Sequence, residues 1–220
     1  MDEDQEFKVT DSLPQTLLEL EEAEKAKPKE FLEVEYKYDA SCIDRMIFKD
    51  LVKTFNPKSF IYVESSDIYY AKSKDEFLRY RKPSENKLSG EENRQELTFK
   101  KKSVDKNNWT RIEVNLRIDL NDPFLVHSFC EGLGYKKNFE IVKSCDIYFF
   151  EDGDLVYYSV KDQDGKYKCY IEIEAVEDCG HTREQSLEIL QKYEKMLAPL
   201  GITAQNRKRL SLWEMYRKGF

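Results

Sequence analysis

Alternating apolar and polar residues run through most of the chain after residue 30 and predict a series of β-strands. In the first run, Phe31–Asp39, Leu, Val and Tyr alternate with Glu, Lys and Asp, which is the period of a strand with two different faces. Turn-forming residues separate further runs of this kind. The additional strands are expected over residues 59–70, 76–83, 96–102, 109–119, 139–150, 154–162 and 166–177.

Three segments have helical spacing of their apolar residues instead, over 41–55, 122–134 and 182–201. Asp122-Pro123 is a suitable N-cap and first-turn pair for the second of them. Thr182 and Gln185 have the spacing of a capping box for the third. Strands joined mainly by hairpins, with a few helices between them, predict an α+β domain built on an antiparallel sheet.

Residues 1–30 differ from the rest because they are acidic and lack strand patterning. We expect them to form a mobile N-terminal extension, with a short helix around Leu17–Lys25 as the alternative. The folded domain is expected to span residues 31–220.

Composition narrows the classes of function. The chain has 220 residues, with 36 Lys and Arg against 43 Asp and Glu, and a formal net charge of -7. This acidic balance argues against binding to double-stranded nucleic acid. No apolar run resembles a membrane span or a signal peptide, and the five cysteines form no CxxC pair. We therefore expect a cytoplasmic protein without a disulfide framework or a zinc site.

Charged residues recur at period two on strand after strand, with acids mainly on the first and last strands and bases on the middle ones. The rows are Glu33, Glu35 and Lys37; Arg79 and Arg81; Lys100 and Lys102; Arg111, Glu113, Asn115 and Arg117; Glu172 and Glu174. One interpretation is a sheet with a solvated, charged face. The other is a closed barrel of eight strands whose charged interior binds a small polyanion together with a divalent cation.

The motifs that contain these charges occur in a characteristic order. The chain has ExExK at Glu33–Lys37, DxYY at Asp67–Tyr70, LRxR at Leu78–Arg81, LTxK at Leu97–Lys100, RxE at Arg111–Glu113, a Leu-Gly-aromatic triplet at Leu133–Tyr135, and ExE at Glu172–Glu174. This order resembles the CYTH, or triphosphate tunnel metalloenzyme, superfamily, which includes class IV adenylyl cyclases, thiamine triphosphatases, inorganic triphosphatases and, more distantly, RNA triphosphatases. The resemblance covers about residues 31–217 and implies a closed eight-stranded antiparallel barrel, with helices outside and Leu210–Tyr216 as its final strand.

The sequence departs from the family pattern in three places. Asn115 stands where the family has Glu, and Cys145 stands where it has Arg. The acid expected before the last ExE strand is assigned by spacing to Asp162, with Ser159 as the other candidate. These departures leave a changed substrate, weakened catalysis or a tunnel that only binds its ligand as alternatives.

The resemblance also implies roles for individual residues. The metal ligands for one or two Mg²⁺ or Mn²⁺ ions would be Glu33, Glu35, Glu113, Asp162, Glu172 and Glu174. The triphosphate would be bound by Lys37, Arg79, Arg81, Lys100, Arg111 and Lys143. Among these, the catalytic residues would be Lys37, Glu35, Arg79 and Arg81.

These roles predict a metal-dependent triphosphatase that hydrolyses an inorganic, nucleoside or other organic triphosphate. The first alternative is a cyclase that makes cyclic AMP and pyrophosphate from ATP, and the second is a non-catalytic binder of polyphosphorylated ligands. The expected partner is a small triphosphate, an RNA 5′-triphosphate end stays open as a ligand, and so does a homodimer. No membrane partner is expected.

Overall fold

The computed structural model of the protein describes residues 32–83, 95–102, 110–118, 122–175 and 182–219. All of the described residues belong to one unit, Phe31–Phe220. The expected N-terminal extension and the helix around Leu17–Lys25 lie outside the described residues. Among the described residues, no helix is long and apolar enough to cross a membrane.

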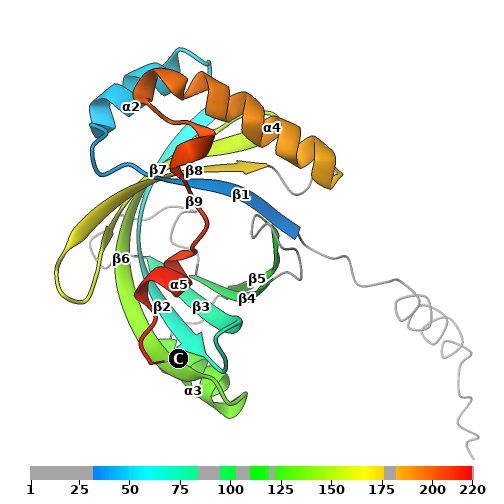
Figure 1. The fold of residues 1–220 in the computed structure, drawn as a ribbon. Helices are drawn as coiled ribbons and strands as arrows, with labels where there is room; N and C mark the ends of the chain where they lie inside the picture. The colour runs from blue at the N-terminus through cyan, green and yellow to red at the C-terminus, as the bar shows by residue number, and fades with distance from the viewer. Residues whose placement is uncertain (1–31, 84–94, 103–109, 119–121, 176–181, 220) are drawn as a thin grey trace, which may run out of the picture. The chain divides into compact units, whose positions relative to one another are not determined.

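The described strands of this unit form a single antiparallel sheet of nine strands. In spatial order they are β5 (Thr110–Ile118), β4 (Gln95–Lys102), β3 (Glu76–Pro83), β2 (Ser59–Ala71), β6 (Lys136–Phe149), β7 (Gly153–Lys161), β8 (Tyr167–Ala175), β1 (Leu32–Asp39) and β9 (Arg207–Lys208). The sheet is strongly curled, so that its two ends approach each other (Figure 1). The α+β class and the antiparallel sheet expected from the sequence are confirmed.

The closed barrel of eight strands expected from the sequence is wrong, because the sheet forms an open half-barrel. Among the described residues, β5 pairs with β1 at three positions, from Leu32 opposite Ile112 to Val34 opposite Thr110. Beyond Val34, β1 pairs with β8 and with the two-residue strand β9. The periodicity of a strand shows which face is buried, but it does not show how far two edges stay paired.

Helices cover the convex, apolar side of the sheet at two places. At one end, α2 (Arg45–Lys53) and α4 (Arg183–Met196) lie over β7, β8 and β1, and at the other end α3 (Pro123–Gly132) lies near β2 and β3 (Figure 1). Phe48 of α2 and Leu190 of α4 pack with outward-facing residues such as Tyr38 and Ile171. Because successive strand residues point to opposite faces, this packing turns the charged alternate positions toward the concave side.

The C-terminal segment differs from the expected final strand over Leu210–Tyr216. Apart from the short β9, it forms the helix α5 (Leu212–Tyr216), which lies inside the curl of the sheet (Figure 1). Ser211 accepts a hydrogen bond from the backbone of Glu214, and the Glu214 carboxylate accepts one from the backbone of Ser211. This capping box satisfies backbone donors at the helix start, which explains why a segment with weak strand alternation becomes helical.

Gly153 at the start of β7 has no room for a side chain, and this predicts a clear effect on stability. A methyl group there would lie 2.8 Å from the backbone oxygen of Glu174 and 2.9 Å from the ring of Tyr193. We expect Gly153→Ala to lower the free energy of unfolding by about 1–3 kcal/mol, as other overpacked sites do. Gly132→Ala is the matched control, because nothing lies within 4 Å of that position. Denaturant unfolding of the two variants measures the difference, and equal stabilities would contradict the prediction.

Candidate functional site

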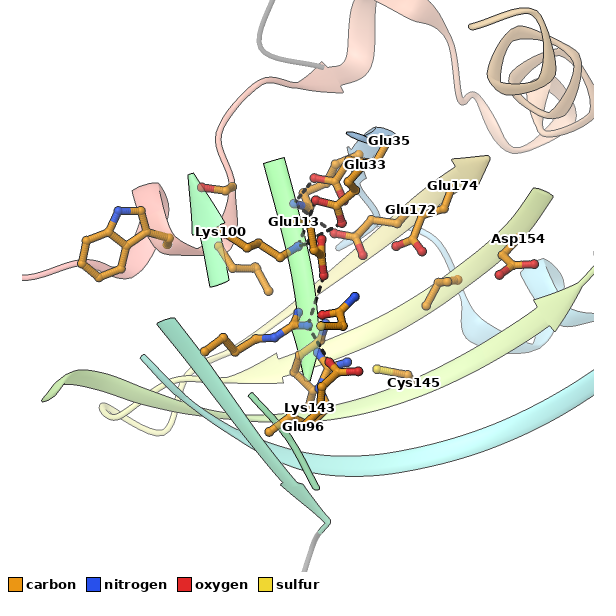
Figure 2. A pocket seen from close by; sticks show the side chains of 18 of the residues that line it. Glu33, Glu35, Glu96, Lys100, Glu113, Lys143, Cys145, Asp154, Glu172 and Glu174 are labelled. Carbon is orange, nitrogen blue, oxygen red and sulfur yellow. Dashed lines mark hydrogen bonds and ion pairs between the residues drawn. The ribbon is translucent and has the colours of Figure 1, made fainter. Parts of the chain in front are cut away.

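A polar cavity of about 290 Å³ lies on the concave side of the sheet. Its lining comes from alternate residues of β1 and β3 to β8, from Tyr69 of β2, and from the start of α5. Ten of the residues predicted from the sequence line it: Glu33, Glu35, Lys37, Arg79, Arg81, Lys100, Glu113, Lys143, Glu172 and Glu174. Figure 2 shows the acidic residues of β1 and β8 close to Lys100, with Lys143 and Cys145 farther along the cavity.

Three carboxylates form a cluster at the junction of β1 and β8. Glu33, Glu35 and Glu174 each offer an oxygen within 4.8 Å of the others. The register explains this closeness, since Glu35 lies directly opposite Glu174 and two residues from Glu33. Carboxylate oxygens are the ligands that Mg²⁺ and Mn²⁺ prefer, so this donor set fits a hard divalent cation.

The electrostatics of the cluster agree with that fit. Burial, together with the negative charges of Glu172 and Glu35, raises the pKa of Glu174 to about 8. Burial also raises the pKa of Glu33 well above its usual value, although Lys100 opposes the shift. Carboxylates in this situation need a proton or a cation to neutralise them.

Lys37 joins the two acidic strands, β1 and β8, through ion pairs. Its side chain is buried, and its Nζ lies 2.9 Å from Glu172 and 3.3 Å from Glu35. Lys37 lies opposite Glu172 in the pairing of β1 with β8, so the strand register itself creates the ion pair. The lysine balances part of the negative charge that the ExExK and ExE motifs place together.

Lys100 connects the cluster to β5. Its Nζ lies 2.9 Å from Glu33 and 2.6 Å from Glu113. Burial would raise the pKa of Glu113, but Lys100 and Arg79 outweigh it and lower the pKa to about 2. Glu113 is therefore ionised at neutral pH and serves as a fixed partner for these bases.

Two arginines of β3 form the next part of the wall. Arg79 donates to Glu96 at 3.0 Å and to Thr98 at 2.9 Å. Arg81 makes two hydrogen bonds of 2.8 Å to the fully buried carboxylate of Asp67. Planar guanidinium groups held in this way are oriented in advance for phosphate oxygens.

Lys143 of β6 is the cavity cation with the fewest competing partners. Its side chain is buried and its Nζ lies 4.1 Å from the centre of the Tyr158 ring. Within the described ranges, no carboxylate forms an ion pair with it. An ammonium group that faces a cavity over an aromatic ring is suited to an anionic ligand.

Two predicted residues are not placed in the cavity. Arg111 lies opposite Glu33 in the β1–β5 pairing, but its side chain is outside the described part of the structure. Asp162 lies in the turn after β7, where its carboxylate accepts hydrogen bonds from the backbone of Asp164 at 3.0 Å and Lys166 at 2.9 Å. Ser159, the other candidate, does not line the cavity either.

Asp154 and Glu96 line the cavity although the sequence interpretation did not select them. Asp154 lies on β7, eight residues before Asp162. Because residues an even number apart point to the same face of a strand, Asp154 occupies the face on which Asp162 was expected. β7 ends at Lys161, and the turn therefore takes Asp162 out of the sheet. Glu96 could have been found by the same parity rule, because it lies two residues before Thr98 and four before Lys100.

The raised pKa of Glu174 predicts how stability depends on pH. In the unfolded chain a glutamate ionises near pH 4.3, whereas in the fold Glu174 stays protonated up to about pH 8. The native state thus binds more protons between these values, and its stability falls as the pH rises through this window. We expect Glu174→Gln to remove this loss, stabilising the protein by on the order of 1–3 kcal/mol at pH 8.5 and by little at pH 4.5. Thermal unfolding of both proteins without added metal measures this difference. Equal stabilisation at pH 8.5 and pH 4.5 would show that the raised pKa of Glu174 is not its cause.

Comparisons with known proteins agree with this fold. No family model and no curated protein matches the sequence. A solved protein of Pyrococcus horikoshii OT3 is 27% identical, with a TM-score of 0.64, and the match covers 83% of this chain and 97% of that one.

Two solved structures of lower identity have the same fold. A Vibrio parahaemolyticus protein provisionally assigned as an adenylate cyclase is 15% identical, with a TM-score of 0.61 over 84% of this chain and 97% of its own. The RNA triphosphatase domain of a mimivirus mRNA capping enzyme is 10% identical, with a TM-score of 0.54 over 86% of this chain and 97% of its own. The resemblance inferred from the motifs is confirmed for the fold: the chain has the fold of the triphosphate tunnel metalloenzymes.

Proposed function

We propose that this protein is a divalent-metal-dependent phosphohydrolase that cleaves a triphosphate in the cavity. The proposal rests on one observation: a carboxylate cluster and a group of buried bases line the same cavity. The carboxylate cluster of Glu33, Glu35 and Glu174 lies next to a wall of buried bases that includes Lys100 and Lys143. Hard cation ligands beside fixed positive charges are the two halves of a metal–phosphate site.

The cation would be held by Glu33, Glu35 and Glu174, with Glu172 adjacent. When bound, Mg²⁺ or Mn²⁺ would supply Lewis-acid stabilisation of phosphate oxygens and a water of lowered pKa. Lys37 pairs with both Glu35 and Glu172, so it balances part of the negative charge beside the proposed cation site.

The bases would bind and orient the phosphate groups. Lys100 and Arg79 pair with carboxylates in this structure, and phosphate oxygens can replace those carboxylates as their partners. Lys143 needs no such exchange. Because the groups are held in place before the reaction, they would stabilise the charge that develops in the transition state without large rearrangement.

Hydrolysis is proposed over cyclisation because it needs only a water as nucleophile, whereas a cyclase must also orient a ribose. The mimivirus domain with this fold is an RNA triphosphatase, and the Vibrio protein carries a provisional cyclase assignment. RNA ends and ATP therefore both belong among the substrates to be tested.

The test is an analysis of products. The protein is incubated with Mg²⁺ or Mn²⁺ and, separately, inorganic triphosphate, ATP, GTP, thiamine triphosphate and a 5′-triphosphate RNA. Glu33→Gln is the inactive comparison, and Glu188→Gln on the exposed side of α4 is the matched control. Orthophosphate released by the wild type and by Glu188→Gln, but not by Glu33→Gln, is the expected result.

Other outcomes contradict the proposal in distinct ways. Pyrophosphate together with a cyclic nucleotide identifies a cyclase. Heat of ligand binding that is lost in Glu33→Gln, without turnover of any substrate, identifies a binding protein. If the protein neither turns over nor binds any of these ligands, the proposal of a triphosphate site is rejected altogether.

A further inference from the structure

Tyr158 of β7 lies between a basic and an acidic residue of the cavity lining. It is fully buried, and it does not line the cavity itself. In the strand pairings it lies opposite Cys145 of β6 on one side and opposite Tyr170 of β8 on the other. Lys143 and Glu172 each lie two residues from one of these partners, so both are diagonal neighbours of Tyr158 and within reach of an aromatic side chain.

The hydroxyl of Tyr158 holds one oxygen of Glu172. It donates to Oε1 of Glu172 at 2.7 Å, and Nζ of Lys37 lies 2.9 Å from the same oxygen. Because both donors contact Oε1, neither of them occupies Oε2. Glu172 lines the cavity two residues from the carboxylate cluster, so a carboxylate fixed by one oxygen keeps the other available for a cation there. Groups that orient a metal ligand by a hydrogen bond commonly change the metal affinity by about 10- to 100-fold.

The ring of Tyr158 supports Lys143. Nζ of Lys143 lies 4.1 Å from the centre of the ring, which is a cation–π distance. The ring packs in turn near Tyr170, with ring centres 5.4 Å apart, and belongs to a buried cluster that also contains Val160 and Trp213. Such burial excludes water and strengthens both polar contacts of the side chain. The ring is therefore a rigid support for the ammonium group.

We infer that Tyr158 is a positioning residue of the proposed metal–phosphate site: its hydroxyl orients Glu172 as a cation ligand, and its ring fixes Lys143 for the phosphate groups. One buried side chain thus serves both halves of the site without lining the cavity. The inference rests on the proposed function and adds a residue that neither the charge pattern nor the cavity lining contains. A tyrosine that only filled space in the core would not affect the two ligands separately.

Tyr158→Phe separates the two roles, because it removes the hydroxyl and keeps the ring. Calorimetry gives the dissociation constant of Mg²⁺ alone and, in separate titrations without a divalent cation, that of inorganic triphosphate. We expect Mg²⁺ binding to weaken by about tenfold or more, and triphosphate binding to stay within about twofold of the wild type. Tyr158→Leu also removes the ring, so it should weaken both, triphosphate binding by about fivefold or more.

Tyr170→Phe is the matched control. Tyr170 is also buried and belongs to the same cluster, but its hydroxyl lies near Met215 and Tyr216. Its variant should bind Mg²⁺ and triphosphate as the wild type does. The same loss of Mg²⁺ binding in this control as in Tyr158→Phe would show that any buried hydroxyl has this effect, which overturns the inference.

A double-mutant cycle with Glu172→Gln tests whether the hydroxyl acts through Glu172. If it does, Tyr158→Phe should weaken Mg²⁺ binding in the wild-type background and change it by less than about twofold in the Glu172→Gln background. An equal loss in both backgrounds would mean that the hydroxyl acts on some other group, and the inference would be wrong.

The remaining results are equally distinct. Unchanged or tighter Mg²⁺ binding in Tyr158→Phe overturns the inference and leaves the proposed hydrolase intact. Equal weakening of Mg²⁺ and triphosphate in this variant indicates general damage to the site and overturns it as well. A wild type that binds neither ligand rejects the proposed function itself. If Tyr158→Leu does not fold, which circular dichroism would show, Tyr158→Phe and the cycle decide the matter.

Discussion

Glu35→Gln is expected to lower kcat/KM by on the order of a thousandfold or more, while leaving the protein folded. Glu35 belongs to the carboxylate cluster and also pairs with Lys37 at 3.3 Å. The amide keeps the size of the side chain but removes its negative charge, so the cation would lose a charged ligand and Lys37 would lose one of its partners. The first change acts on the proposed cation site, and the second acts on the lysine that balances its charge.

The measurement is steady-state turnover of the best substrate over a range of Mg²⁺ concentrations, together with Mg²⁺ binding by calorimetry. Glu188→Gln, an exposed change of the same chemistry on α4, is the control and should match the wild type. We expect weaker Mg²⁺ binding in Glu35→Gln, and activity that excess Mg²⁺ does not fully restore. Wild-type activity in Glu35→Gln would contradict a role for the cluster in catalysis.

The strand pattern of the sequence predicted which side chains would meet. Charges at period two on β1 and β8 placed Glu33, Glu35 and Glu174 on one face, and the register of the two strands then made them neighbours. The parity of a strand depends only on backbone geometry, so it can be read from the sequence without knowledge of the tertiary structure. The same argument put the apolar residues of these strands under α2 and α4.

What the sequence did not predict depends on where strands end and how far they stay paired. Asp162 had the correct parity, but β7 stops one residue before it and the backbone of the following turn binds its carboxylate. Within the described ranges β5 pairs with β1 at three positions, and the sheet forms an open half-barrel. Tertiary packing and turn geometry set these limits, and the alternation of apolar and polar residues along a strand does not show them.

The C-terminal segment shows a related limit. The residues around Trp213 are apolar enough for a strand, and the family pattern favoured one. The capping box of Ser211 and Glu214 was present in the sequence as S-x-x-E, and it decided the local structure. A local signal for a helix start thus outweighed a resemblance that covered the rest of the domain.

Asp67→Asn is expected to lower the free energy of unfolding by about 3–5 kcal/mol, because it removes one member of a buried ion pair. Asp67 is fully buried and makes two hydrogen bonds of 2.8 Å with Arg81. Burial alone would raise the pKa of Asp67, but Arg81 outweighs it and holds the pKa well below its usual range. The ion pair therefore stabilises the fold at all pH values above about 4, and this contribution is lost only as the pH falls through the lowered pKa.

A double-mutant cycle distinguishes the contribution of Arg81 to stability, through its ion pair with Asp67, from its proposed role in phosphate binding. Asp67→Leu and Arg81→Met should each destabilise the protein, since the first removes the carboxylate partner of the half-buried Arg81 and the second leaves the fully buried Asp67 carboxylate without its guanidinium. The double variant Asp67→Leu/Arg81→Met should recover most of the lost stability, because replacing both members of a buried pair with apolar residues is often close to neutral. Its catalytic activity should nevertheless stay low, since the guanidinium that lines the cavity is gone. Urea unfolding and phosphate release measure the two properties, and a stable double variant with wild-type activity would show that Arg81 holds Asp67 and does not bind the substrate.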